Sequence, residues 1–232
     1  MGSNDFITLF FLVAAVLIFL QLRSVLGRRT GNEKPPFEAA SPRETAKPEV
    51  SETGKVITLP RRDTIENEDR LNQADFYTKP GTEANSDLRE LMKIDPAFDP
   101  KAFFNGARLA YEMIVTAFAD GDRNTLRGLL SKDVFDSFES AIAERESRGE
   151  KVKFTFVGIS KLDVAKIDIK GSDVQVTLNI ESQLISATLD RDGTIIEGDE
   201  ETVAEVNDIW TLSRDIQSRN PNWTVVATES EQ

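Results

Sequence analysis

The chain has 232 residues, with 28 Lys and Arg against 40 Asp and Glu, which gives a formal net charge of −12. It contains no His and no Cys, which excludes disulfides, thiolate nucleophiles, imidazole bases and metal sites built from these side chains. The excess of acidic residues argues against a nucleic-acid partner, because neutralising phosphates requires clustered Lys and Arg.

An apolar run opens the chain, from Phe6 to Leu22, in which only Thr8 and Gln21 are polar. As a helix it would be about 25 Å long, slightly short of the roughly 30 Å hydrocarbon core of a bilayer. The run predicts a single membrane-spanning helix. Its apolar side chains include Phe6, Leu9, Leu12, Val16, Phe19 and Leu22.

Positive charge follows this run at Arg23, Arg28 and Arg29, and none precedes it. The excess of positive charge after the span predicts that the bulk of the protein lies in the cytoplasm or an equivalent compartment. The alternative is a cleaved signal peptide, which needs a basic segment before the apolar run. Residues 1–5 contain no basic side chain, so we expect residues 1–27 to be a retained membrane anchor.

Residues 28–95 form the second predicted region. They contain six of the nine prolines, together with 12 basic and 14 acidic residues, and few large apolar side chains. Such a segment cannot bury enough apolar surface to offset the entropy lost on ordering. We therefore predict a charged, mainly disordered linker, in which residues 55–59 and 69–76 are the short patches able to fold onto a partner.

The folded domain is predicted to occupy residues 96–232 and to begin with a long helix. Asp99 and Pro100 suit the N-cap and first helical positions. The following residues to Asp120 carry a wide apolar face, as expected of a helix buried against a sheet. Gly121 suits the position just after the helix.

Two shorter helices are predicted next. Asp122 is expected to cap a short helix that ends at Leu130, and a third helix is expected to start at Ser131 or Asp133 and to end at Gly149. In the third helix, Glu144 and Arg148 are spaced to form an ion pair.

Beyond Gly149 the apolar period changes to two, which predicts strands. Asp190–Gly193 is a turn signal within this region. Three helices followed by four or five antiparallel strands predict an α+β domain, in which a curved sheet wraps around the helices. The predicted strands cover residues 151–159, 162–169, 174–180 with a continuation over 183–189, 202–214 and 223–227.

Five motifs follow one another along this domain. They are FFxGARxAYExI at 103–114, AFADGDRxxLRxLL at 117–130, VFxxFxxAIxxRExxG at 134–149, DIWTLSR at 208–214 and PNWTVVAT at 221–228. In this order they resemble the Tim44-like family. Its members include the membrane-associated adaptor of the mitochondrial inner-membrane preprotein translocase and single-span bacterial relatives.

The resemblance implies a cone-shaped fold similar to nuclear transport factor two, with helices and a curved sheet around an apolar pocket. With its N-terminal span, the chain resembles the bacterial group, which implies a single-pass protein of the bacterial inner membrane with a cytoplasmic C-terminal domain. The implied function is a membrane-anchored adaptor that binds partner proteins and is linked to protein translocation or membrane-complex assembly. The alternative is a lipid-binding or small-molecule-binding module. We expect no cofactor and no enzymatic activity.

The candidate site residues are Tyr111, Phe118, Trp210 and Arg214. The three aromatic side chains either line a pocket or form ordinary core. Arg214 either anchors an anion, such as a lipid phosphate, or pairs with a carboxylate of the chain. Arg108 is expected to form a salt bridge on the flank of its helix.

Six carboxylates lie within residues 190–201. Their spacing matches no calcium loop, so we expect a solvated acidic hairpin and no metal site. Residues 96–232 hold 15 basic and 25 acidic residues, a balance that repels anionic lipid. The predicted span is therefore expected to do the anchoring.

Overall fold

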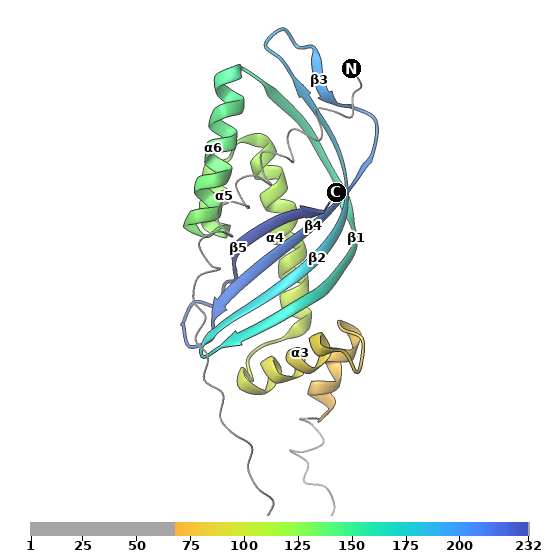
Figure 1. Ribbon diagram of the computed structural model, residues 1–232, viewed down its shortest axis with the longest axis vertical. Helices are drawn as coiled ribbons and strands as arrows, with labels where there is room; N and C mark the ends of the chain where they lie inside the picture. Colours follow the sequence, from red (N-terminus) through yellow and green to blue (C-terminus); the bar gives the residue numbers. More distant parts are fainter. Residues whose placement is uncertain (1–67, 232) are drawn as a thin grey trace, which may run out of the picture.

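The computed structural model describes residues 68–231 (Figure 1). The predicted membrane span at Phe6–Leu22 and the predicted linker up to residue 67 lie outside the described residues. Among the helices of residues 68–231, none is long and apolar enough to cross a membrane.

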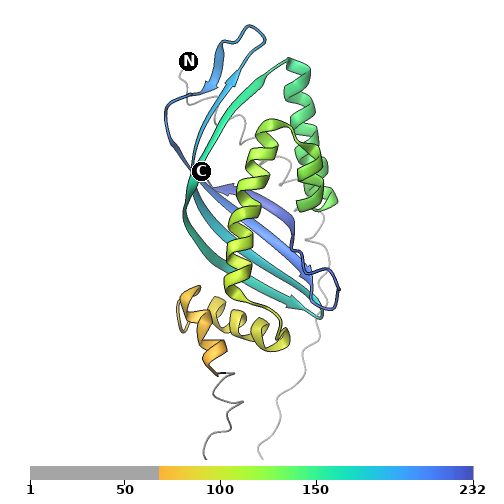
Figure 2. The same cartoon turned by 180° about the vertical axis from the view of Figure 1, so that it is seen from behind.

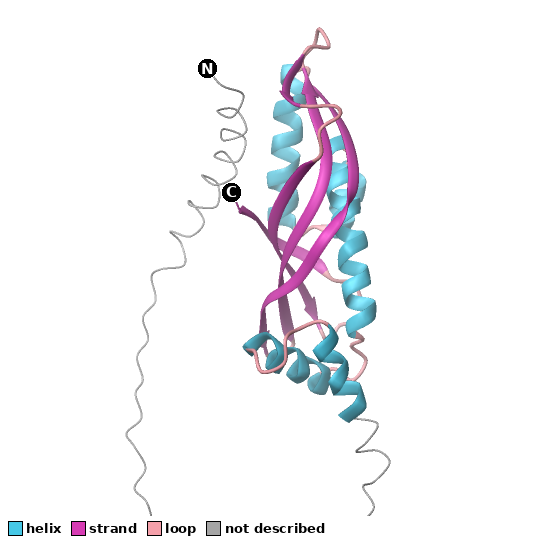
Figure 3. Cartoon of the chain, turned by 90° about the vertical axis from the view of Figure 1, so that its right-hand side faces the viewer, coloured by secondary structure: helices cyan, strands magenta, loops and turns pink. Residues whose placement is uncertain are grey.

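An antiparallel sheet forms the centre of the fold, with the strand order β1-β2-β4-β5 and with β3 paired to β2. Three register shifts interrupt the pairing of β1 with β2, and such bulges bend strands. The long strands accordingly curve around the helices (Figures 1 and 3). The strands are β1 (Lys151–Lys170), β2 (Asp173–Leu189), β3 (Ile195–Gly198), β4 (Ala204–Asp215) and β5 (Thr224–Glu231).

Helix α4 (Pro100–Asp120) runs along the sheet, and Figure 2 shows it in front of the strands. Helices α5 (Arg123–Leu129) and α6 (Lys132–Arg148) follow it, while α3 (Glu83–Ile94) lies at the end of the sheet opposite β3 (Figure 1). This arrangement of helices and curved antiparallel sheet confirms the predicted α+β class.

The helix ends lie where the local sequence predicts them. The side chains of Asp99, Asp122 and Ser131 accept hydrogen bonds from the first turns of α4, α5 and α6. Gly121 and Gly149 follow α4 and α6 with φ angles of 73° and 74°, which glycine adopts without a Cβ clash. The predicted pair of Arg148 with Glu144 is also present, at 2.6 Å. The salt bridge predicted for Arg108 is absent from residues 68–231.

The core lies between α4 and the concave face of the sheet. Its buried side chains come from α3, α4, α5, α6 and the strands of the sheet. The alternation predicted for β2 is confirmed, since every second residue of its first half is buried. The largest apolar members include Leu88, Leu91, Met92, Ile114, Leu126, Ile142, Val174, Val176, Leu178, Ile180 and Val225.

The prediction of a disordered linker was wrong for residues 68–95. Leu88, Leu91 and Met92 of α3 are at most 1% exposed and belong to the core. The Arg70 guanidinium donates a hydrogen bond to the carbonyl of Pro96 at 3.3 Å and another to the carbonyl of Met92. Packing against the rest of the domain stabilises this helix, which explains why its charged composition misled the prediction.

Substitution of Gly198 tests a close backbone contact in the β2–β3 hairpin. Gly198 has φ 75°, and a Cβ there would lie 2.1 Å from the carbonyl oxygen of Ser186. At Gly171, with φ 65°, a Cβ would meet no atom of residues 68–231 within 4 Å. The left-handed conformation alone costs an alanine roughly 1–2 kcal/mol, so both variants lose stability.

Gly198→Ala is expected to disrupt the β2–β3 pairing as well. The Asp199 N–H donates to the Ser186 carbonyl at 3.0 Å and should exchange with solvent faster in Gly198→Ala than in the control Gly171→Ala. Equal exchange rates in the two variants would show that the contact does not constrain the hairpin.

Candidate functional site

A buried polar network joins α4 to three strands. Tyr111, in the middle of α4, is fully buried, and its hydroxyl donates a hydrogen bond to Oδ2 of Asp208 at 2.7 Å. The same hydroxyl lies 2.8 Å from Oγ of Ser182 on β2. The other oxygen of Asp208 accepts a hydrogen bond from Ser230 on β5 at 2.6 Å. The network therefore fixes how the helix sits on the sheet.

Burial governs the protonation of this network. It raises the pKa of the Asp208 carboxyl, an effect that the hydrogen bonds from Ser230 and Tyr111 partly oppose. Burial and the nearby Asp208 charge raise the pKa of Tyr111. Tyr111 therefore remains a neutral hydrogen-bond donor at physiological pH, which suits a structural role.

Two of the four candidate residues meet in the interior. The rings of Tyr111 and Trp210 lie 4.7 Å apart between centroids, and Phe156 lies 6.0 Å from Tyr111. Trp210 is 5% exposed. At this level of the domain, packed side chains occupy the space between α4 and the sheet.

Phe118 lies two turns farther along α4, at the margin of the same core, where it forms a separate group of contacts. Its ring packs against Phe138 of α6, with the centroids 4.9 Å apart. The Arg145 guanidinium lies 5.7 Å from the Phe118 ring and donates to the carbonyls of Phe118 and Ala119 at 3.1 and 2.9 Å. This cluster holds α6 against the end of α4.

Arg214 forms an ion pair with Asp95, the C-cap residue just after α3. The two side chains are 14% and 10% exposed, and the Arg214 guanidinium carbon lies 5.2 Å from the centre of the Trp223 ring. Among the described residues, Nε of Arg214 is buried without a hydrogen-bond partner. Of the two roles left open by the sequence, the carboxylate pair is the one present; a role in anion binding stays a prediction.

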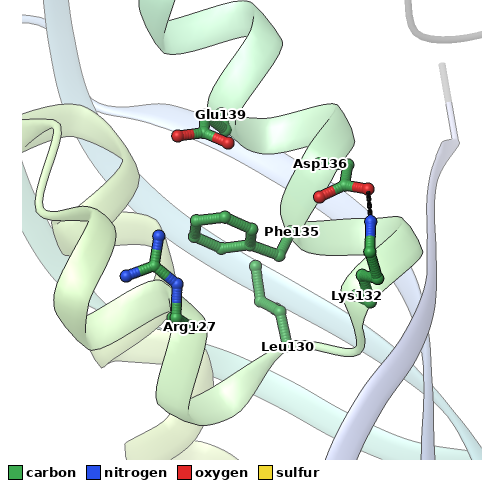
Figure 4. Close-up of a pocket in the computed structure, with 6 residues that line it drawn as sticks. All are labelled: Arg127, Leu130, Lys132, Phe135, Asp136 and Glu139. Atoms are coloured by element: carbon green, nitrogen blue, oxygen red, sulfur yellow. Dashed lines mark hydrogen bonds and ion pairs between the residues drawn. The ribbon is translucent and has the colours of Figure 1, made fainter.

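The depressions on the surface of residues 68–231 include two that Tyr111, Phe118 and Trp210 do not line. The first, of about 440 Å³, lies between α5 and α6. There the Arg127 guanidinium lies 4.7 Å from the Phe135 ring, and Lys132 pairs with Asp136 at the side (Figure 4). The second, of about 310 Å³, lies beside the β4–β5 turn and includes Arg214.

The sequence interpretation did not identify Ser182, Ser230 or Asp95 as partners of the candidate residues. Ser182 had a signal, because it follows the buried apolar residues of β2 at the same inward spacing. A polar residue at an inward position requires a hydrogen-bond partner. Asp95 lay in the predicted linker, where no contact was expected.

A family profile of the Tim44-like domain matches residues 84–230 of the chain. The chain belongs to the Tim44-like family. The resemblance predicted from the motifs is thereby confirmed. The match of this Tim44-like chain begins inside α3, which agrees with the folding of residues before 96.

The curated relatives of this Tim44-like chain are translocase subunits by name. Mitochondrial import inner membrane translocase subunit TIM44 of Rattus norvegicus is 22% identical over 141 residues, covering 60% of this chain and 31% of the relative. The probable subunit tin-44 of Caenorhabditis elegans is 23% identical over 141 residues, covering 60% and 33%. The chain thus spans about a third of the length of these relatives.

Among solved structures, the intermembrane space region of the chloroplast protein ARC6 is similar to this Tim44-like chain with a TM-score of 0.40 and 15% identity. The comparison covers 58% of this chain and 98% of that one.

Proposed function

We propose that this Tim44-like protein is a membrane-anchored adaptor of the bacterial inner membrane. Its N-terminal segment holds it at the membrane, and its folded cytoplasmic domain binds partner proteins in protein translocation or membrane-complex assembly. The observation that carries the proposal is the family match over residues 84–230, because curated relatives are named as inner membrane translocase subunits. The anchor rests on the apolar run at residues 6–22.

The arrangement of the domain supports binding through its outer surface. Tyr111 and Trp210 pack against each other in the interior, and the Arg214–Asp95 pair holds α3 to the sheet. These aromatic residues do not line the depression between α5 and α6 or the one beside the β4–β5 turn. We therefore rank the adaptor above the alternative of a lipid or small-molecule module.

The membrane anchor is tested by extracting cell membranes with alkaline carbonate. The full chain is expected in the membrane pellet, and a variant lacking residues 6–22 is expected in the supernatant. Release of most of the full chain into the supernatant would show that the protein has no spanning anchor.

The adaptor role is tested by cross-linking in cells, followed by mass spectrometry. Photo-reactive residues are placed in the full chain both at exposed positions of the folded domain and within residues 28–67; the control, a chain of residues 1–67, carries only the latter. Proteins captured by the full chain and absent from the control support the adaptor. If the two chains capture the same set of proteins, the folded domain is not a protein-binding module.

A further inference from the structure

A short segment packs beside α3 ahead of the region that the family profile matches. Residues 68–72 are helical and run into the 3-10 helix η1 (Gln73–Phe76), and residues 77–80 follow it. This segment, residues 68–80, is called here the strap. It is the orange part of Figure 1, beside α3 at the end of the sheet opposite β3. The profile match covers residues 84–230, so the strap is an addition to the matched domain.

The strap buries few of its own side chains. Within residues 68–80, Ala74 and Thr78 are the buried residues, and Phe76 is 85% exposed. The half-buried Tyr77 ring stacks on Phe104 of α4 at 4.5 Å. A segment with few buried apolar side chains and an exposed backbone opens locally at a lower free-energy cost than the core. We therefore expect the strap to be less stable than the helix that it covers.

Polar side chains of α3 hold the strap in place. The Arg89 guanidinium pairs with Asp75 at 2.7 Å and donates to Asn72 at 3.4 Å. The Asn85 amide donates to Asp75 at 2.9 Å and to the Thr78 hydroxyl at 3.1 Å. Water replaces hydrogen bonds of this kind when both groups become exposed, so each bond makes a modest net contribution to stability. These contacts specify where the strap lies, while its release remains less costly than unfolding the core.

A natural hinge joins the strap to α3. Gly81 is exposed and has φ 81°, and a Cβ there would meet no atom of residues 68–231 within 4 Å. Hinges are a few loop residues that absorb a change of φ and ψ. The next residue, Thr82, caps α3 by accepting the Asn85 N–H at 3.2 Å. Helix α3 therefore keeps its N-terminal cap when the strap moves.

We propose that the strap opens as a unit of its own, while the rest of the domain stays folded. The proposal rests on the membrane-anchored adaptor proposed above, because in an anchored chain the strap continues the tether between the membrane and the domain. With the strap closed, the tether ends at residue 68. With the strap open, it ends at the Gly81 hinge and gains up to about 45 Å of extended chain. The strap thus gives the domain two distances to which it can reach.

Hydrogen exchange of the full chain in detergent micelles tests the proposal, because it reports local opening residue by residue. The Tyr77 and Thr78 N–H groups donate to the Ala74 carbonyl at 3.0 Å and report on the strap. The amides of Leu91 and Met92, whose side chains are 0% exposed, report on α3. After correction for intrinsic rates, the two strap amides are expected to exchange at least about tenfold faster than the two α3 amides.

A substitution in α3 should loosen the strap alone. Arg89→Ala removes the contacts with Asp75 and Asn72 and places a strong helix former at this position. The strap amides are expected to exchange about two- to tenfold faster than in the wild type, with the rates of the α3 amides unchanged. Lys93→Ala is the matched control, because Lys93 also lies on α3 and pairs with Glu90 at 3.6 Å.

Three results would overturn the proposal. Equal exchange rates in the strap and α3 would show that the strap unfolds only with the domain. Strap amides that exchange as fast as those of an unstructured peptide would show that the closed state does not form. The third is an equal effect of Arg89→Ala on the strap and on α3. None of these results bears on the adaptor role, which carbonate extraction and cross-linking test separately.

Discussion

Asp95→Ala is expected to lower the free energy of unfolding by about 3–5 kcal/mol, because it leaves a buried guanidinium without its carboxylate. Arg214 and Asp95 are 14% and 10% exposed, and Nε of Arg214 already lacks a partner within the described chain. Urea unfolding of the full chain measures the change. The matched control is Asp163→Ala, which breaks an ion pair with Lys161 whose side chains are 51% and 56% exposed. An exposed pair contributes about 0–1 kcal/mol.

A double substitution separates the effect of leaving Arg214 unpaired from the effect of losing the ion pair itself. Replacing both Asp95 and Arg214 by apolar residues removes the unpaired charge and is expected to recover most of the lost stability. If Asp95→Ala lowers the free energy of unfolding no more than Asp163→Ala does, the Arg214–Asp95 pair does not hold α3 to the sheet.

Tyr111→Phe is expected to lower the free energy of unfolding by about 1–3 kcal/mol, because it removes one hydroxyl and leaves buried polar partners without it. The chain has two tyrosines, and Tyr77→Phe is the matched control. The Tyr77 ring stacks on Phe104 at 4.5 Å, a contact that phenylalanine retains. The control should therefore unfold like the wild type, and an equal loss in both variants would contradict a special role for the Tyr111 hydroxyl.

The cost of Tyr111→Phe should depend on pH. The folded pKa of Asp208 is raised from its usual value of 3.8, so the folded state binds more protons than the unfolded state in the window above that value, and stability falls as pH rises through it. The Tyr111 hydroxyl opposes this shift. Without it the pKa of Asp208 rises further, so the variant should lose more stability at neutral pH than in acid. Parallel pH profiles for variant and wild type would refute this coupling.

Local chemistry explains which parts of the fold could be predicted. Asp99, Asp122 and Ser131 cap helices through hydrogen bonds to residues two or three positions later. The identity of a few neighbouring residues is therefore enough to predict where these helices begin. Helix α3 depends instead on distant packing of Leu88 and Leu91. Strand β3 has four residues, too few to show a period.

The candidate site residues contact partners that are distant in the sequence, and no local sequence pattern predicts such contacts. The inward positions of Tyr111 and Trp210 follow from periodicity, and the structure places their rings together. The partnership of Tyr111 with Ser182 and Asp208 also requires the register of β2 with β4, in which Ile180 lies opposite Asp208. The Arg214–Asp95 pair joins residues 119 positions apart. Periodicity along a strand does not specify the register of a neighbouring strand or the position of a distant carboxylate.

The two edges of the sheet restrict how a partner can be recognised. Strand β1, which forms one edge, contains five lysines and bends at three register shifts in its pairing with β2, features that hinder the addition of another strand. At the other edge, Leu130 bridges to Val225 of β5, whose carbonyl accepts the Ser131 N–H at 2.8 Å. These features make the pairing of an extended peptide with either edge less favourable. For the proposed adaptor, recognition of a partner is therefore expected to use side chains of the outer faces. The same edge features also oppose strand-to-strand aggregation of crowded copies.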